Sequence, residues 1–260
     1  MTALVKTAVA DGVATLTLNR PKEMNSFDGD TARAIIEAVE AFAIDDSVRV
    51  MVLAAEGRSF SAGGDFNWVL SWPELDAITR RVGADVMMGA VQAVYDFPKP
   101  SIARVHGAAV GGGIGLMLAC DFAIAASSAR FGLTSARNGL LAGIAIPVLI
   151  QAVGPRVARQ LLMHGGLFDC ATALRLGLVD QVVAADQLDP AIATLAAELK
   201  LSAPSVQSLV KQLITAVNAV AHDANTADFL GEHVANQCMT DEAIEGMKAF
   251  LDKRKPRWAV

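Results

Sequence analysis

The stretch Ser101–Asp121, SIARVHGAAVGGGIGLMLACD, decides the fold of this 260-residue chain. Its first residues predict an apolar strand, the chain turns at His106-Gly107, and the apolar run Ile114–Cys120 predicts a helix. Three consecutive glycines, Gly111–Gly113, precede this helix. Each glycine in a helix costs about 0.5–1 kcal/mol relative to alanine. The run therefore indicates that the backbone approaches something closely at this point.

Two interpretations of these glycines remain open. The first N–H groups of a helix have no partner inside the helix and carry the positive end of its dipole. They are suited to hold an oxygen that bears negative charge. The plainer interpretation is a glycine-rich turn that packs against a neighbouring strand.

The pattern of strand, glycine turn and helix recurs over the first 180 residues, and the last 70 or so are helical in pattern. This order predicts an α/β core followed by a helical C-terminal section. Strands are predicted at Val5–Val9, Val13–Leu18, Val48–Ala55, Phe122–Ala125 and Leu178–Val183. Helices are predicted at Asp28–Ile44, Pro155–His164, Ala171–Leu176, Gln187–Leu201, Ser205–Ala219, Asn225–Met239 and Asp241–Lys253.

Two segments have a less regular pattern. The section from Phe66 to Tyr95 is helical with breaks at Pro73 and Gly83. Its Trp68 and Trp72, four residues apart, are expected to pack in the core or, alternatively, to form the wall of an apolar ligand pocket. The second segment, residues 139–150, is an apolar run of twelve residues and is expected to form one apolar element.

Composition and charge restrict the class of protein. Hydrophobic residues make up 53% of the chain, which indicates a large core and buried subunit interfaces. The net charge of −5 offers no basic surplus for binding nucleic acid or an anionic membrane. The apolar run at residues 139–150 has twelve residues, too few to span a bilayer, and the N-terminus lacks a signal-peptide pattern.

The cysteines and histidines show no pattern typical of a metal site, so no metal is expected. Cys120, Cys170 and Cys238 are far apart in the sequence and odd in number. We expect all three to be buried thiols, and the protein to be cytoplasmic.

A family resemblance emerges from two glycine-rich segments taken together. The first glycine loop is Gly57–Asp65, GRSFSAGGD, and the second glycine loop is His106–Gly113. The other matching motifs are LTLNRPKEMNSF at residues 16–27, Ala119-Cys120-Asp121, Arg130-Phe131-Gly132, Gly177-Leu178-Val179 and EGMKAFLDKRKP at residues 245–256. In this order they resemble the crotonase superfamily, the enoyl-CoA hydratase/isomerase family, over nearly the whole chain.

The resemblance implies a fold and an assembly. Residues 1–195 would form a spiral of repeated ββα units that binds acyl-CoA, and residues 196–260 a helical C-terminal trimerisation region. The expected partner is a second and third copy of the chain, as a homotrimer or a dimer of trimers.

The resemblance also implies a chemistry. The family acts on acyl-CoA thioesters and holds the thioester oxygen, as it becomes an enolate, with two main-chain N–H groups that map onto Gly64 and Gly112. One such donor is typically worth about 10²–10³ in rate. Coenzyme A is part of the substrate, and no covalently bound cofactor is expected. The residues that map onto coenzyme A contacts are Lys22, Met24, Ala62, Gly64, Asp65, Phe66, Asn67, Phe250 and Lys253, the last two reaching the ligand of a neighbouring subunit.

The two acid–base glutamates of the family's hydratases are replaced in this chain. They map onto Gly115 and Ser135, and no Asp or Glu occurs between Asp121 and Asp169. A serine hydroxyl is a far weaker base than a carboxylate near neutral pH. Since one general acid–base group contributes about 10²–10⁴ in rate, conventional hydration is expected to be very slow.

Three hypotheses follow. The first is an acyl-CoA enzyme in which Ser135 positions water or substrate and the acid or base comes from Glu232 or His233, the substrate or a bound anion. The second is a catalytically weak or inactive acyl-CoA-binding protein. The third, the least favoured, is a scaffold without a ligand.

Overall fold

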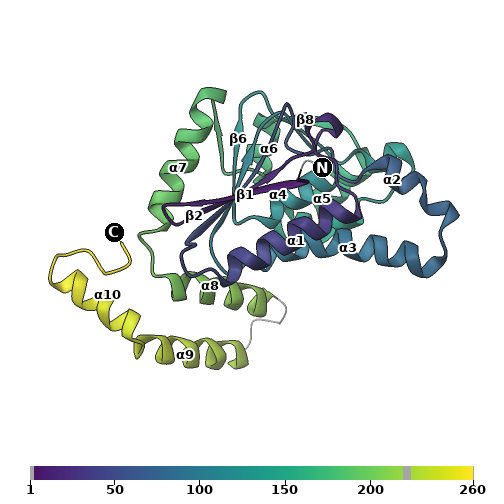
Figure 1. The fold of residues 1–260 in the computed structure, drawn as a ribbon. Helices are drawn as coiled ribbons and strands as arrows, with labels where there is room; N and C mark the ends of the chain where they lie inside the picture. Colours follow the sequence, from purple (N-terminus) through teal and green to yellow (C-terminus); the bar gives the residue numbers. More distant parts are fainter. Residues whose placement is uncertain (1–2, 219–223, 260) are drawn as a thin grey trace.

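The computed structural model describes residues 3–218 and 224–259, whose strands form two sheets covered by helices (Figure 1). The larger sheet has the strand order β1-β2-β3-β4-β6-β9, and the smaller one β5-β7-β8. The strands are β1 (Val5–Ala10), β2 (Val13–Leu18), β3 (Val50–Ala55), β4 (Ser101–Val105), β5 (Ala108–Val110), β6 (Phe122–Ala126), β7 (Arg130–Gly132), β8 (Leu167–Asp169) and β9 (Gln181–Val183).

Helices follow most of the strands and then fill the C-terminal section. The α-helices are α1 (Gly29–Ile44), α2 (Phe66–Leu70), α3 (Ala77–Tyr95), α4 (Gly112–Ala119), α5 (Ile146–His164), α6 (Cys170–Leu176), α7 (Leu188–Leu199), α8 (Pro204–Asn218), α9 (Ala224–Cys238) and α10 (Asp241–Leu251). Short 3₁₀ helices are η1 (Pro21–Glu23), η2 (Trp72–Glu74), η3 (Thr134–Asn138), η4 (Gly143–Ala145) and η5 (Ala185–Gln187). The α/β prediction is confirmed.

Parallel pairing in the large sheet brings the two glycine loops to one edge. The two predicted strands β1 and β2 form a hairpin, with Asp11 and Gly12 at positive φ in the turn. From β2 onward, neighbouring strands run parallel. The first glycine loop follows β3 and the second follows its neighbour β4. Because the carboxyl ends of parallel strands meet at one edge, both loops start side by side.

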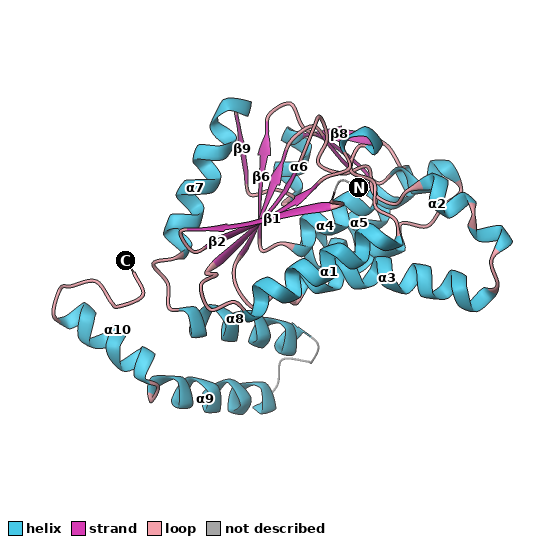
Figure 2. Cartoon of the chain, viewed as in Figure 1, coloured by secondary structure: helices cyan, strands magenta, loops and turns pink. Residues whose placement is uncertain are grey.

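The large sheet is covered on both faces (Figure 2). Helices α1, α3 and α4 pack on one face around a core that contains Leu16, Met51 and Leu53. Helix α7 covers the other face, where Ile192 packs in a second cluster with Val52. The continuous apolar pattern of β3 is typical of a strand buried on both sides, and the structure confirms that prediction.

Residues 139–150 do not form the single apolar element that was predicted. They contain a loop, the short helix η4 and the start of α5, which begins at Ile146. Helix α5 is kinked at Gly154, whose φ of 73° and ψ of 164° are not helical. The predicted helix Pro155–His164 is its second half, because Pro155 has no N–H to continue the first half.

Gly83 does not break α3, contrary to the sequence prediction. A β-carbon at Gly83 would lie 3.2 Å from the ring of Trp72 and 3.3 Å from that of Trp68. The glycine therefore makes room for the two indoles, which pack edge to face with centroids 5.1 Å apart. Both tryptophans are partly buried against the main core.

The expectation that all three cysteines are buried is wrong for Cys238. Cys120 and Cys170 are buried, and burial raises the pKa of the Cys120 thiol. Cys238 is exposed at the end of α9. Within the described residues, no helix is long and apolar enough to cross a membrane, and no group of His, Cys, Asp or Glu side chains gathers as a metal site.

The C-terminal helices lead away from the sheets. Helix α8 is tied to the core by an ion pair in which Lys211 Nζ lies 2.9 Å from Asp121 Oδ2. Helices α9 and α10 extend beyond it as an arm (Figure 1). The chain after α10 returns to the start of β3, where Arg49 donates a hydrogen bond to the carbonyl of Trp258. The arm leaves Val234, Met247 and Phe250 exposed.

Candidate active site

The two glycine loops pair with each other beyond the ends of β3 and β4. The amide of Ser61 donates to the carbonyl of Ala108 at 3.0 Å, and the amide of Val110 donates back to the carbonyl of Ser61 at 2.9 Å. A β-carbon at Gly113 would collide with the same Ser61 carbonyl. The glycines are therefore needed where one loop presses against the other, which also fits the plainer interpretation of this stretch.

Beyond this pairing, the amides of Gly64 and Gly112 come close together. A β-carbon on Gly63 would lie 2.6 Å from the amide nitrogen of Gly112. Standard backbone dimensions then place the nitrogens of Gly64 and Gly112 within about 6.5 Å of each other. In the described part of the chain, neither N–H donates a hydrogen bond to a backbone carbonyl. Gly112 opens α4, so its amide precedes the hydrogen-bond ladder of that helix.

Apolar side chains stand beside both amides. The terminal methyl of Met87 lies 2.9 Å from the position of a β-carbon on Gly64. Ile144 Cδ1 lies 2.5 Å, and Phe27 Cζ 2.9 Å, from the corresponding position on Gly112. Carbon atoms of α3 and η4 therefore lie next to the two glycines.

The two positions onto which the resemblance maps glutamates, Gly115 and Ser135, differ in their surroundings. Gly115 is buried in α4, and a β-carbon there would lie 3.4 Å from Ala145 Cα and 3.5 Å from Val91. Ser135 is partly buried in η3, and its hydroxyl lies 3.8 Å from the position of a β-carbon on Gly111. The structure thus brings Ser135 next to the start of α4, whereas a β-carbon at Gly115 would be in van der Waals contact with α3 and η4.

Arg20 anchors the first glycine loop to the loop that follows β2. Its guanidinium lies 2.9 Å from Asp65 and 3.4 Å from Asp28, and it donates to the carbonyl of Ser26. Partial burial raises the pKa of Asp28, but hydrogen bonds from Thr31 and the charge of Arg20 outweigh this and lower it. Asp65 caps the N-terminus of α2, so its carboxylate has a structural role.

The predicted coenzyme A contacts of the N-terminal half lie together at one rim of the site. Lys22 is exposed in η1, and the carbonyl of Met24 accepts a hydrogen bond from the amide of Ala62 at 2.9 Å. Phe66 and Asn67 are exposed in the first turn of α2, directly after Gly64 and Asp65. The structure therefore gathers these residues beside Gly64.

Comparison with known proteins adds independent information. A model of the enoyl-CoA hydratase/isomerase family matches residues 8–260. The chain belongs to this family. It is 34% identical over 246 residues to a crotonyl-CoA hydratase of Syntrophomonas wolfei, covering 94% of this chain and 93% of that one.

Solved structures of the family share the fold over the whole chain. An enoyl-CoA hydratase from Shewanella pealeana superposes with a TM-score of 0.94 at 31% identity, covering 98% of this chain and 96% of that one. An enoyl-CoA hydratase of Mycobacterium smegmatis gives a TM-score of 0.92 at 32% identity, with complete coverage of both chains. The crotonase fold expected from the sequence is therefore confirmed.

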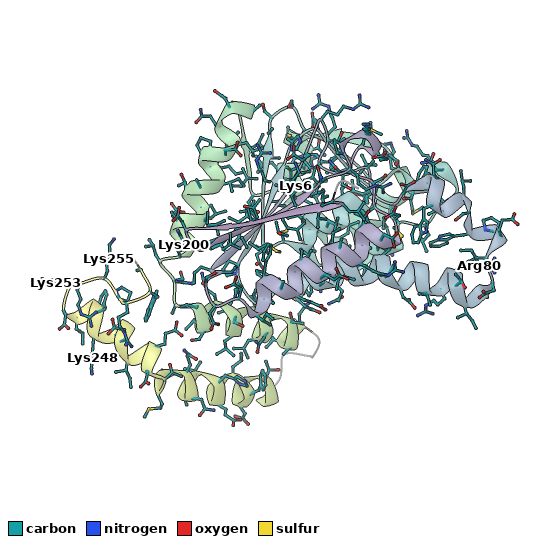
Figure 3. The ribbon with its side chains drawn as sticks, in the orientation of Figure 1. Lys6, Arg80, Lys200, Lys248, Lys253 and Lys255 are labelled. Carbon is teal, nitrogen blue, oxygen red and sulfur yellow. The ribbon has the colours of Figure 1, made fainter. Side chains whose placement is uncertain are left out.

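Phe250 and Lys253 are not brought to the other predicted site residues of this family member. Phe250 lies in α10 and Lys253 follows it, in the section that returns to the start of β3 at Trp258, whereas the glycine loops follow the carboxyl ends of β3 and β4. Figure 3 shows Lys248, Lys253 and Lys255 together on this arm, far from Arg80 on α3. Phe250 is 82% exposed.

Several residues beside the glycine loops gave no sequence signal. Met87 and Ile144 stand in helical or irregular apolar segments that contain many similar residues. Arg20 and Asn25 belong to a matching motif, LTLNRPKEMNSF, but no role was assigned to them. Their side chains bond backbone and carboxylate groups far along the chain, which a linear pattern does not reveal.

Proposed function

We propose that this family member binds an acyl-CoA thioester and stabilises its enolate with the N–H groups of Gly64 and Gly112. The observation that carries the proposal is the approach of two amides that have no backbone partner in the described chain. A carbonyl oxygen accepts two hydrogen bonds readily, and donors fixed in advance stabilise the charge that develops on it.

The coenzyme A part of the substrate lies along the rim formed by Lys22, Met24 and Ala62 and the start of α2, with Phe66 and Asn67. Phe250 and Lys253 approach it from a neighbouring copy, in a homotrimer or a dimer of trimers. The exposed apolar side chains of α9 and α10 support such an assembly, because large exposed apolar surfaces mark interaction sites.

The chemistry is that of the enoyl-CoA hydratase/isomerase family, with the acid–base groups rearranged. Ser135 is near enough to the start of α4 to orient water or substrate. The carboxylate of Asp65 is occupied by Arg20 and by the amides of α2. Glu232 and His233 lie on α9, so a base from that helix comes from a neighbouring copy. Otherwise the substrate or a bound anion supplies it.

The alternative function is acyl-CoA binding with weak or no catalysis. Its support is the apolar packing around Gly115, where hydratases of the family have a glutamate. An oxyanion site without an acid or base still holds the thioester carbonyl.

Calorimetry with crotonyl-CoA, together with turnover assays on a panel of acyl-CoA thioesters, tests both functions. The enzyme proposal requires turnover that falls at least about 100-fold in Gly112→Val, because the valine keeps its N–H but collides with Ile144 and Phe27 and displaces a donor worth about 10²–10³ in rate. Gly177→Ala is the matched control, because a β-carbon there meets nothing within 4 Å. Binding without turnover supports the alternative, and absence of binding contradicts both.

A further inference from the structure

His106 stands where the two glycine loops diverge from the parallel strands. It directly follows β4, and its carbonyl accepts a hydrogen bond from the amide of Phe60 in the first loop at 2.9 Å. The next residue, Gly107, has a φ of 59°, and a β-carbon on it would collide with the carbonyl of Arg58. The joint between the loops therefore depends on residues 106 and 107.

The neighbours of the imidazole ring determine which nitrogen carries its hydrogen. His106 Nε2 lies 2.9 Å from the carbonyl oxygen of Gly57, which only accepts hydrogen bonds. Nδ1 lies 3.3 Å from Arg104 Nη1, which only donates. Both contacts are satisfied together only by the neutral ring with its hydrogen on Nε2.

The carbonyl that the ring holds belongs to a tightly placed turn. Gly57 has a φ of 80°, and a β-carbon on it would lie 2.6 Å from Pro21 Cβ. On the other side, Asn25 Nδ2 donates to the carbonyls of Glu56 and Ser59, at 2.8 Å each. His106 and Asn25 thus hold residues 56–59 from two sides, immediately before the run that leads to Gly64.

Charged groups hold Arg104 in place against the ring. Arg104 Nε donates to Asp189 on α7 at 2.5 Å, and this bond lowers the pKa of Asp189. Glu56, the other carboxylate that faces His106, is paired with Lys6 at 2.9 Å. The ring is therefore part of a fixed chain of contacts that runs from α7 to Gly57.

We propose that His106 is a positioning residue that, as the neutral Nε2–H tautomer, holds Gly57 and so aligns the amide of Gly64 with that of Gly112. It contacts no substrate. The inference rests on the proposed function of the two amides, but its structural part is independent of any ligand.

Three substitutions separate the hydrogen bond from the bulk of the ring. His106→Gln keeps an N–H donor at the reach of Nε2, whereas His106→Asn carries the same amide one methylene shorter and His106→Leu has no donor. We expect kcat to fall about 10- to 100-fold in the Leu and Asn variants, since small misplacements of catalytic groups have effects of this size. The kcat of the Gln variant should be close to that of the wild type. Equal loss in all three variants, with unchanged melting temperatures, would overturn the proposal.

Nuclear magnetic resonance of the free protein tests the structural part without an activity. The ¹⁵N shifts of the ring, assigned by the signal that disappears in His106→Gln, should show a protonated Nε2 and an unprotonated Nδ1 near neutral pH. The backbone amide signals of Gly64 and Gly112 should move in His106→Leu and stay in place in His106→Gln. The proposal would be contradicted by a ring protonated on Nδ1, or by amide signals of Gly64 and Gly112 that do not move in His106→Leu. If no thioester binds, the proposed function fails while these spectra still decide on His106.

Discussion

The amide nitrogen of Gly112 lies 2.6 Å from the position that a β-carbon on Gly63 would occupy. Gly63 also has a φ of 85°, and the carbonyl of Val110 lies 2.8 Å from the same position. Contact between the loops therefore requires glycine at position 63 for two reasons. Its positive φ disfavours other residues, and a β-carbon would collide with the second loop. The same contact sets the separation of the amides of Gly64 and Gly112.

Replacement of Gly63 by alanine should separate the two amides. We expect a loss of at least about 100-fold in kcat on any thioester that the protein turns over, equivalent to one oxyanion donor. The backbone strain should also cost about 1–3 kcal/mol in free energy of unfolding. Steady-state kinetics and chemical denaturation measure the two effects. Gly177→Ala introduces comparable strain at a φ of 75° without a clash, and it should lose stability but keep its kcat.

A carboxylate at position 135 should create or increase hydratase activity. Ser135 is only partly buried, so a carboxylate at this position keeps contact with solvent and remains ionised. We expect hydration of crotonyl-CoA to rise about 10²-fold, the lower end for one general acid–base group. Ser135→Ala is the control, and its rate of crotonyl-CoA hydration should not rise. If Ser135→Glu leaves the rate unchanged, the hydroxyl of residue 135 does not face the reacting carbons.

The other glutamate position should tolerate restoration poorly. Gly115→Glu would start its side chain beside Ala145, Ile144 and Val91, and none of the three is a cation. Burial of an unpaired charge costs about 3 kcal/mol or more. Denaturant unfolding should therefore show a loss of this size for Gly115→Glu and much less for Ser135→Glu. Equal stability of the two variants would mean that the packing around Gly115 rearranges easily.

The sequence predicted those parts of the site that rest on backbone and local pattern. The glycine run before Ile114 indicated a close backbone approach at the start of α4, and the family resemblance paired Gly112 with Gly64. The sequence did not predict Met87 or Ile144 as neighbours of these glycines. Their contacts depend on how α3 and η4 pack across the loops, and an apolar residue in an apolar segment carries no sign of its partner. Gly83 was misjudged for the same reason, since its neighbours Trp68 and Trp72 come from another helix and a 3₁₀ turn.

Ile144 should determine which acyl groups fit beside the amides. Its Cδ1 lies closest to the β-carbon position of Gly112, so Ile144→Ala enlarges the space next to the carbonyl. We expect the kcat/KM for branched thioesters, relative to that for straight-chain ones, to rise about 10-fold or more. Substrates that differ by one methylene in an apolar pocket are typically discriminated by a factor of this size. Leu149→Ala, in the buried core of α5, is the matched control. It should lose stability without a change in this ratio, and an equal shift in both variants would point to general loosening.

Glu245 should control whether the chain after α10 stays folded back at low pH. Its carboxylate accepts hydrogen bonds from both terminal nitrogens of Arg254, at 2.7 and 2.9 Å, and from the amide of Arg257. The Arg254 bonds lower the pKa of Glu245 from 4.5 to about 2. A carboxylate with a depressed pKa in the folded state stabilises that state fully above pH 4.5 and loses its contribution as the pH falls towards 2. The indole of Trp258, which donates to the carbonyl of Leu201, reports on this segment by fluorescence.

In the wild-type protein, the fluorescence of Trp258 should therefore stay that of the folded-back segment to below pH 4. In Glu245→Gln, whose amide has no charge to pair with Arg254, the fluorescence should be that of the released segment already at neutral pH. Trp258→Phe identifies the contribution of this indole against those of Trp68 and Trp72. Asp252→Asn is the control. Asp252 lies 3.6 Å from Arg254 and is largely exposed, so its loss should leave the fluorescence unchanged, because exposed ion pairs contribute little. A release of the wild-type signal centred near pH 4.5, or an unchanged signal in Glu245→Gln, would show that the hydrogen bonds to Arg254 do not hold this segment.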